Sequence, residues 1–255
     1  MTDKEDKWFV KRMEDLARTA DRDGYAVCSD FLNEHQQQLV RSLEPGLPVS
    51  VYYTGGYDGA ERVVAVFCPV WNEAAREEGP DLQLLRVTLA GARFLTKRPG
   101  HRDYLGALMG CGIQREKLGD IGLEDEGAWI WVKQEIAPYL CDELTSVGSV
   151  LCRTEPAQWD GQARREEARE SVISVSSLRL DSVVSRGFHL SRGTAAEEIR
   201  AGRVYLNGSL LQQPDRAVKP NDSVTLRGKG KLRILEEVGV SRSDRIQLRV
   251  ERLGK

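Results

Sequence analysis

The hydrophobic positions in the last third of the chain change from a helical to a strand period. Apolar residues recur every three or four positions over 178–184 and again over 195–199, which predicts two short helices. Apolar and polar residues then alternate over 204–206 and 224–226, which predicts strands. A further alternating run at 246–250 suggests one more strand of the same sheet. The expected module therefore has two helices packed on a small sheet.

Polar residues mark where these elements begin and turn. Ser191 and Thr194 are both candidate N-caps of the second helix, and Thr194 with Glu197 fits a capping box. The pair Asn207-Gly208 follows the first strand and tolerates positive φ at both central positions of a type I′ turn. We therefore expect the first strand to continue directly into a tight hairpin.

The first half of the chain shows its most regular pattern over residues 82–152. The expected order is strand 82–89, helix 102–109, strand 118–122, strand 128–132, helix 133–144 and strand 148–152. This β-α-β-β-α-β order is the ferredoxin-like arrangement that RNA-recognition motifs share. Trp129 and Trp131 would lie on one face of a strand, where they either stack on RNA bases or pack against the core. Packing is favoured, because the basic and aromatic consensus of RNA-recognition motifs is missing.

The residues before this region predict two helices and a hairpin. An apolar stripe at helical spacing runs from Trp8 to Ala20, and Asn33 with Gln36 fits a capping box for a second helix. Strands are expected at 49–54 and 62–68. The glycine-rich loop between these strands lacks the spacing of a nucleotide-phosphate loop, so a hairpin connection is favoured over a phosphate site.

These patterns predict an α+β protein with three folded parts and one linker. The expected boundaries are an N-terminal α/β region at 1–76, a ferredoxin-like domain at 77–155, a charged linker at 156–175 and the C-terminal module at 176–255. The linker is expected because the run RREEARE mixes charges of both signs with few apolar residues.

Charge divides the chain more sharply than its net value of −2 suggests. Residues 162–255 contain 19 Lys and Arg against 12 Asp and Glu, a net charge of +7, which leaves −9 for residues 1–161. Within the module, residues 179–233 contain eleven basic and five acidic residues, a net charge of +6. Such a basic field favours a polyanion. The acidic half should avoid bare phosphate, and it either faces a protein partner or meets RNA only where the basic module has already docked.

Composition argues against several other classes of protein. No apolar run is long enough to span a bilayer and the first residues do not resemble a signal peptide, so we expect a cytoplasmic protein that does not bind membranes. The five cysteines form no C-x-x-C pair, and the three histidines have no companions at ligand spacing. We therefore expect neither a metal site nor a cofactor.

The module carries motifs in a distinctive order: LRLD, SR, AxxxI, GRVxxNG and DSVxLRGKGK. This order resembles the S-four (S4) RNA-binding domain, also called the αL motif, in which two short helices pack on a small sheet. The resemblance implies an RNA face that includes the start of the second helix and the following strand. The corresponding residues are Ser191, Arg192, Thr194, Arg203 and Asn207, with Arg179 and Arg186 on the first helix and Arg227, Lys229 and Lys231 at the rim.

Three earlier segments extend the resemblance. DFLNEHQQQL at 30–39, GGYDGAERVVAVFCP at 55–69 and HRDYLGALMGCGIQREKLGDI at 101–121 are similar to blocks of the YlmH family of bacterial S4-domain proteins. The resemblance implies a non-catalytic RNA-binding protein, associated with the large ribosomal subunit and peptidyl-tRNA. In that family this association serves ribosome-associated quality control.

Two other functions stay open. S4 modules are often attached to RNA-modifying enzymes, and Arg179-Leu180-Asp181 spells the R-L-D of pseudouridine synthases. Asp181 falls in the first expected helix, however, where an acidic residue more simply supports the helix start and local charge pairing. Alternatively, the acidic half makes the protein an interaction scaffold linked to cell division, because the family is encoded near cell-division genes in many bacteria. RNA binding through phosphates should weaken steeply with salt, whereas an apolar protein interface should not.

Overall fold

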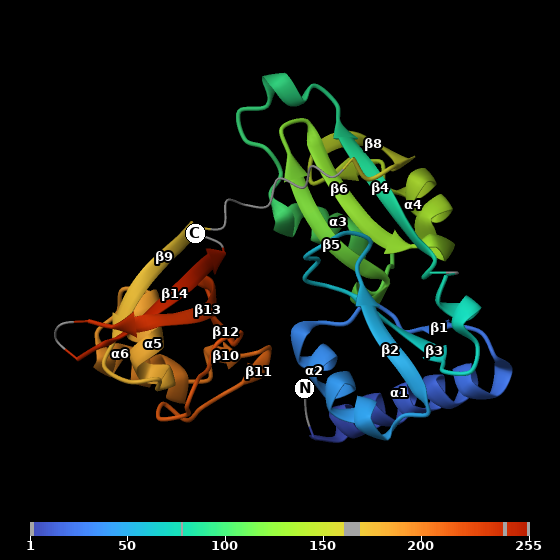
Figure 1. Cartoon of the computed structure of the whole chain (residues 1–255). Helices are drawn as coiled ribbons and strands as arrows, with labels where there is room; N and C mark the ends of the chain where they lie inside the picture. Colours follow the sequence, from blue (N-terminus) through green and yellow to red (C-terminus); the bar gives the residue numbers. More distant parts are fainter. Residues whose placement is uncertain (1–2, 78, 161–168, 242–243, 254–255) are drawn as a thin grey trace. The chain divides into compact units, whose positions relative to one another are not determined.

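The computed structural model describes residues 3–77, 79–160, 169–241 and 244–253, and it divides into two compact units, residues 1–164 and 165–255 (Figure 1). Unit 1 contains three clusters of buried apolar residues and unit 2 contains one. Each unit therefore has its own core, and each is described by itself.

The N-terminal part of unit 1 packs two helices against a three-stranded antiparallel sheet. Its elements are α1 (Asp3–Asp23), β1 (Val27–Cys28), α2 (Glu34–Leu43), η1 (Glu44–Gly46), β2 (Val49–Thr54), β3 (Val64–Pro69) and η2 (Glu73–Arg76), with sheet order β1-β3-β2. The predicted capping box is present: the Gln36 N–H donates to Asn33 Oδ1 and the Asn33 N–H to Gln36 Oε1, both at 2.9 Å. Phe9 and Met13 of α1 are buried, whereas Trp8 is 64% exposed, because it lies about 100° around the helix from Phe9. The expectation that Trp8 belongs to the buried stripe is therefore wrong.

The rest of unit 1 is the expected ferredoxin-like fold. Its elements are β4 (Leu82–Leu89), η3 (Ala92–Phe94), α3 (His101–Gly110), η4 (Arg115–Lys117), β5 (Leu118–Glu124), β6 (Gly127–Lys133), η5 (Gln134–Ile136), α4 (Ala137–Glu143), β7 (Ser146–Val147) and β8 (Val150–Ala157). The sheet is antiparallel, in the order β5-β6-β4-β8-β7. Tyr104 and Leu108 of α3 and Leu140 of α4 pack on one face of this sheet (Figure 1).

The other face of the ferredoxin-like sheet is covered by the N-terminal part of the unit. Trp129 and Trp131 of β6 are only 5% and 7% exposed, and they pack with Phe31, Val64 and Val66. The packing alternative for the two tryptophans is therefore the one that the structure shows. The regions expected as separate domains at 1–76 and 77–155 share this core.

Unit 2 places two helices against one face of a six-stranded antiparallel sheet (Figure 1). Its elements are β9 (Arg169–Val175), α5 (Leu180–Gly187), α6 (Arg192–Arg200), β10 (Val204–Leu206), β11 (Ser209–Leu210), β12 (Ser223–Leu226), β13 (Gly230–Val240) and β14 (Ile246–Leu253), with sheet order β11-β10-β12-β13-β14-β9. Asn207 and Gly208 have φ values of 52° and 77°, and β10 pairs directly with β11, which confirms the predicted hairpin. Ser191 caps α6, so the alternative cap at Thr194 is wrong.

The linker expected at 156–175 is wrong at both ends. β8 continues to Ala157, and β9 begins at Arg169 and pairs with β14 along its whole length. Val175 is fully buried in unit 2 because β9 completes the sheet over the core, whereas Val172 on the opposite face is exposed. The middle of the expected linker, residues 161–168, lies outside the described residues.

Two kinds of feature are absent from the described part of the chain. No helix there has the length and apolar character needed to cross a membrane. Among the same residues, no group of three or more His, Cys, Asp or Glu side chains lies where it could hold a metal ion. The five cysteines are free thiols.

Candidate nucleic-acid interface

The starts of α5 and α6 share one carboxylate. Asp181 accepts hydrogen bonds from Arg179 (Nη2 to Oδ2, 3.1 Å) and from Arg192 (Nη2 to Oδ1, 3.3 Å), and both Nε atoms also donate to it. Only 7% of the Asp181 side chain is exposed, against 45% for Arg179 and 51% for Arg192. A buried carboxylate therefore holds two half-exposed guanidinium groups near each other. We call these three residues the Asp181 cluster.

The charge of this carboxylate is stabilised by its partners. Burial raises the pKa of Asp181, but the hydrogen bonds from Arg179 and Arg192 outweigh burial and hold the pKa below its usual value. Each guanidinium has five N–H donors, so donors remain for a ligand after those used by the carboxylate. Planar guanidinium donors match the oxygens of a phosphate. The cluster is therefore able to hold an RNA backbone.

Ser191 sets the start of α6 beside this cluster. Its Oγ accepts the Thr194 N–H at 3.1 Å, and the two hydroxyl oxygens lie 2.8 Å apart. The first N–H groups of the nine-residue α6 carry partial positive charge that favours an anion. Ser191, Arg192 and Thr194 are all exposed. The structure thus brings four of the predicted contact residues together, with Arg179 as the fourth.

A second basic cluster lies at the other end of α6. Arg203 donates through Nε and Nη2 to the carboxylate of Glu198, with 2.7 Å between Nη2 and Oε1. The hydrogen bond from Arg203 and the charge of Lys229 lower the pKa of Glu198. Arg227 and Lys229 are exposed in the connection from β12 to β13, and Lys231 is half-buried at the start of β13. The rim residues therefore adjoin Arg203 rather than the Asp181 cluster.

Asn207 belongs to the hairpin instead. Its Nδ2 donates to Asp222 Oδ1 at 2.8 Å, and its Oδ1 accepts the Ser223 N–H at 2.7 Å. Both ends of its amide are thus used inside the protein, and we leave Asn207 out of the interface. Arg186, in the last turn of α5, is exposed and borders a separate hollow.

The sequence suggested that Asp181 supports a helix start and local charge pairing, but not that it joins the starts of two helices. A signal was present, because Arg179 precedes Asp181 by two residues and Arg192 begins the next helix. Asp181 and Arg192 are eleven positions apart in the chain, however. Only the packing of α5 beside α6 brings these two side chains together.

The glycine-rich loop of unit 1 has a structural role. Asp120 of β5 accepts hydrogen bonds from the Tyr57 hydroxyl (2.8 Å), the Glu61 N–H (2.7 Å) and the Arg62 N–H (3.0 Å). Burial and the nearby charge of Arg115 lower the pKa of Arg62 to about 10, against the opposing effect of Asp120. The loop is therefore a hairpin connection anchored to the ferredoxin-like sheet. This is the interpretation that the sequence favoured over a phosphate site.

This anchoring also closes the aromatic face of the sheet. Tyr57 stacks on Trp131, with ring centroids 6.5 Å apart and planes 15° apart, and it meets Trp129 edge-on at 5.4 Å. Gly56 has φ 95°, and a Cβ there would lie 2.5 Å from Trp131 Cε3. The two tryptophans therefore cannot stack on RNA bases without displacing this loop.

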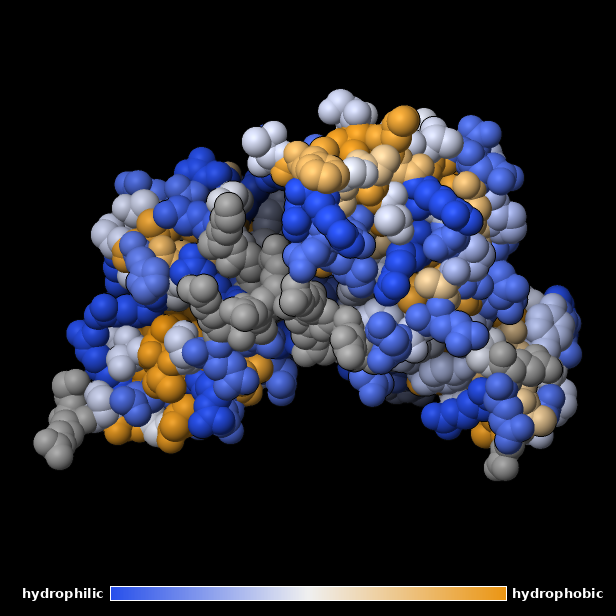
Figure 2. Space-filling model, turned by 90° about the horizontal axis from the view of Figure 1, so that it is seen from above, coloured by the Kyte–Doolittle hydropathy of each residue, from blue (hydrophilic) through white to orange (hydrophobic). Residues whose placement is uncertain are grey.

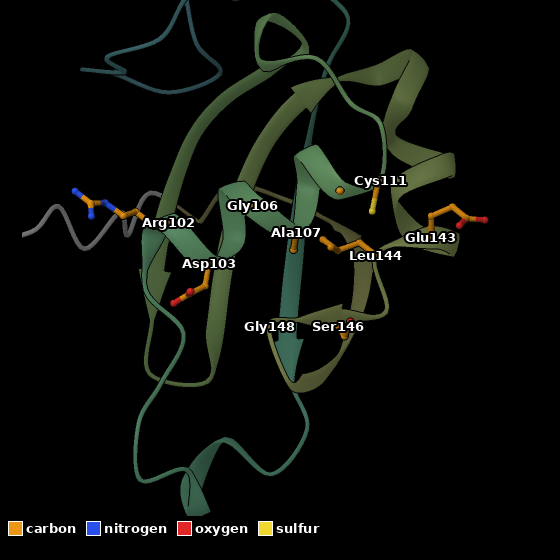
Figure 3. A pocket seen from close by; sticks show the side chains of 10 residues that line it. Arg102, Asp103, Gly106, Ala107, Cys111, Glu143, Leu144, Ser146 and Gly148 are labelled. Atoms are coloured by element: carbon orange, nitrogen blue, oxygen red, sulfur yellow. The ribbon is translucent and has the colours of Figure 1, made fainter.

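The triplet His101-Arg102-Asp103 marks the start of α3. Asp103 Oδ2 accepts the Gly100 N–H at 2.8 Å, which satisfies a backbone donor at the helix start. Figure 3 shows the hollow beside α3, from which Arg102 and Glu143 extend outward on opposite sides. Burial raises the pKa of the Cys111 thiol in this hollow, which disfavours its reactive thiolate form. The raised pKa therefore gives no support to a role of Cys111 as a nucleophile.

The loop between β4 and α3 exposes an aromatic side chain among basic residues. Phe94 is 91% exposed, and Arg93 and Arg98 pair with Glu126 (3.2 Å) and Asp125 (3.3 Å) of the β5–β6 turn. Figure 2, which views the molecule from above, shows hydrophobic side chains at the surface of unit 1 beside strongly hydrophilic ones. These arginines lie in the acidic half of the chain, since residues 1–161 carry a net charge of −9 against +7 for residues 162–255, so this loop is in the less favourable half for RNA phosphate.

Comparisons with known proteins find a matching domain model in each unit. Residues 78–160 match the model of a putative RNA-binding domain in YlmH, and residues 178–224 match that of the S4 domain. Ribosome-associated protein quality control protein P2 of Bacillus subtilis (strain 168) is 27% identical over 252 residues, which are 98% of this chain and 96% of that protein. Small ribosomal subunit protein uS4 of Thermotoga petrophila is 38% identical over 66 residues, 26% of this chain and 32% of that protein.

Two further matches bear on fold and on chemistry. The structure of cell division protein ylmH from Streptococcus pneumoniae has a TM-score of 0.51 at 18% identity, covering 62% of this chain and 94% of that one, and so supports the fold. An uncharacterized RNA pseudouridine synthase of Aquifex aeolicus is 40% identical, but over only 52 residues, 22% of its length. Both domain models match in order and similarity to the B. subtilis protein extends over almost the whole chain, so the chain contains a domain like the putative RNA-binding domain in YlmH followed by an S4 domain.

Proposed function

We propose that unit 2 binds structured RNA of the ribosome without catalysing a reaction. The observation that carries this proposal is the Asp181 cluster, in which one buried carboxylate orients Arg179 and Arg192 beside the start of α6. The proposed ligands are ribosomal RNA of the large subunit and tRNA. The name of the B. subtilis relative supports ribosome-associated quality control as the process, with the cytoplasm as its place.

A binding role suits Asp181 better than a catalytic one. A pseudouridine synthase would require this carboxylate to reach a nucleotide, yet its side chain is 7% exposed and is engaged by two arginines. The same contacts leave the guanidinium groups half-exposed, where a phosphate is able to reach them. The R-L-D triplet is therefore explained without catalysis.

Unit 1 is proposed to contact a protein partner. Residues 1–161 carry a net charge of −9, which disfavours bare phosphate. The sheet face that would stack bases in an RNA-recognition motif is occupied by Tyr57, Phe31 and their neighbours. RNA near unit 1 would then be held chiefly by unit 2.

Sedimentation with purified ribosomal subunits at low and moderate salt tests this function. The test variant, Arg192→Ala/Arg203→Ala, removes one arginine from each basic cluster. The matched control, Arg86→Ala/Arg249→Ala, also removes two half-exposed arginines that pair with glutamates, Glu124 and Glu236. Exposed arginines contribute little to stability, so both variants should remain folded.

We expect the wild type and the control to sediment with large subunits, and the test variant to lose this association. We also expect association to weaken steeply with salt, because each neutralised phosphate contributes about 0.9 to the logarithmic salt slope. Equal association of the folded test variant would overturn the assigned interface. Association that does not respond to salt would favour an apolar protein contact and overturn the phosphate mechanism.

A further inference from the structure

A hollow in unit 2 is lined by basic side chains from three separate segments. Arg186 comes from the last turn of α5, His189 from the turn between α5 and α6, and Arg245 from the residue before β14. Its remaining lining residues are Ile173, Ser174, Ser185 and Leu190. None of these seven side chains is acidic.

The turn that carries His189 is fixed by the backbone. Ser185 accepts the Leu190 N–H through its carbonyl oxygen at 2.8 Å, and its hydroxyl donates to the Leu190 carbonyl at 2.7 Å. His189 adopts a φ of 54°, in the left-handed region that residues other than glycine seldom occupy. The two bonds of Ser185 close the turn around His189 and hold it in this conformation. His189 is therefore held at the edge of the hollow.

Arg245 reaches the same hollow through the sheet. Its N–H donates to Ser241 Oγ at 3.2 Å, and its carbonyl accepts the Ser241 N–H at 2.7 Å, which closes the turn from β13 to β14. Ile246, the next residue, then pairs with Val175 of β9. Because β14 lies between β13 and β9, the residue before β14 is brought to Ser174 and to the end of α5.

The basic groups of this hollow differ in their partners from the arginines of the Asp181 cluster and from Arg203. Arg179, Arg192 and Arg203 each pair with a carboxylate. Within the described residues, neither Arg186 nor Arg245 forms an ion pair, and both offer their full set of donors. Two arginines, a histidine and the Ser174 hydroxyl around one hollow are suited to the oxygens of a phosphate.

We infer that this hollow binds a backbone phosphate of RNA and extends the RNA-binding surface from the start of α6 to the β13–β14 turn. The inference rests on the proposed function of unit 2 and adds His189 and Arg245 to it. His189 is two residues from Ser191, the cap of α6, so the hollow adjoins the helix start. One RNA strand is thus able to contact the Asp181 cluster and the hollow together.

The test compares Arg245→Ala with Arg249→Ala, using a fluorescently labelled RNA hairpin and purified large subunits as probes. The two arginines lie four positions apart, but Arg249 is on the sheet face opposite Leu248 and Val250, which pack in the core with the helices, and it pairs with Glu236. The Arg245 bonds that close the turn come from its backbone, so this substitution should not unfold the unit. Circular dichroism confirms folding of both variants.

We expect Arg245→Ala to weaken RNA binding roughly three- to tenfold at low salt and to reduce the logarithmic salt slope by about one, with Arg249→Ala unchanged. Arg192→Ala is measured beside them. If Arg192→Ala weakens RNA binding and Arg245→Ala does not, the hollow is excluded as a binding site and the proposed function stands. If neither substitution weakens RNA binding, both the inference and the proposed function are overturned. A second measurement records the NMR signals of His189 while inorganic phosphate is added. If phosphate shifts these signals but Arg245→Ala leaves the RNA affinity unaltered, the hollow is a site for free anions and the inference is overturned.

Discussion

Asp181 and Arg192, eleven residues apart, join the starts of two helices, with 3.3 Å between Arg192 Nη2 and Asp181 Oδ1. The carboxylate is nearly buried, whereas the guanidinium is half-exposed. The pair therefore acts as a positioning device for a basic group, and its energetics are measurable without RNA.

Asp181→Asn should lower the free energy of unfolding of unit 2 at pH 7 by about 1 kcal/mol, since the arginines that lose their partner are half-exposed. The pKa of Asp181 is lower in the folded protein than its ordinary value near 3.8. The stability that this carboxylate provides is therefore fully present above that value and is lost as the pH falls through the folded pKa. Urea unfolding at pH 7 and pH 3 should show the difference between wild type and variant shrinking in acid. A difference independent of pH would contradict the ion-pair account.

Ser191→Ala should destabilise unit 2 by about 1 kcal/mol, because it removes the side-chain acceptor for the Thr194 N–H. Thr194→Ala is the matched control, since it keeps that acceptor and removes only a hydroxyl partner. Thermal unfolding of the two variants compares them directly. A larger loss of stability in Thr194→Ala than in Ser191→Ala would indicate that Thr194, and not Ser191, is the N-cap of α6.

Asp120→Ala should destabilise unit 1 by about 2–4 kcal/mol, because three donors of the β2–β3 loop lose their shared acceptor. Asp125→Ala, at a carboxylate that is 71% exposed, should change stability by about 0.5 kcal/mol or less. Chemical denaturation followed by tryptophan fluorescence reports on this region, because Trp129 and Trp131 lie under the loop. Equal effects of the two substitutions would contradict the anchoring role.

Trp131→Ala should destabilise unit 1 by about 3–5 kcal/mol and leave RNA affinity unchanged under conditions where the protein stays folded. The reason is that Trp131 is 7% exposed and packs between the two parts of the unit. Trp8→Ala, at an exposed tryptophan, should change stability little. Loss of RNA binding by folded Trp131→Ala would show that the aromatic face opens to RNA.

Signals between neighbouring residues were sufficient for most local elements. β4 spans 82–89 as expected, the capping box at Asn33 is present, and Asn207-Gly208 forms the predicted hairpin. Each of these depends on backbone geometry and side chains within a few residues, so the sequence pattern contains the needed information. The S4 motifs likewise occur in order along the chain and indicated RNA binding.

The sequence pattern did not predict two strands of unit 2, β13 and β9, and each omission has a physical reason. β13 has register shifts between Ile234 and Glu236 and between Glu237 and Gly239, which break the alternation that marks a strand. β9 follows a run of mixed charges that favours an exposed linker. Its apolar residues can be recognised as part of a strand only when β14 pairs with them. The edge of the sheet was therefore set by pairing between distant segments.

The sequence by itself determined the helices, the turns, the ferredoxin-like order and the basic character of the C-terminal module, because these follow from periodicity, turn chemistry and charge. Only the tertiary structure decided that Trp129 and Trp131 are covered, that Asn207 is used within the protein, and that Arg245 lines the same hollow as Arg186. These facts depend on contacts between residues far apart in the chain. Such contacts form when helices and strands pack, and no local pattern encodes which side chains will meet.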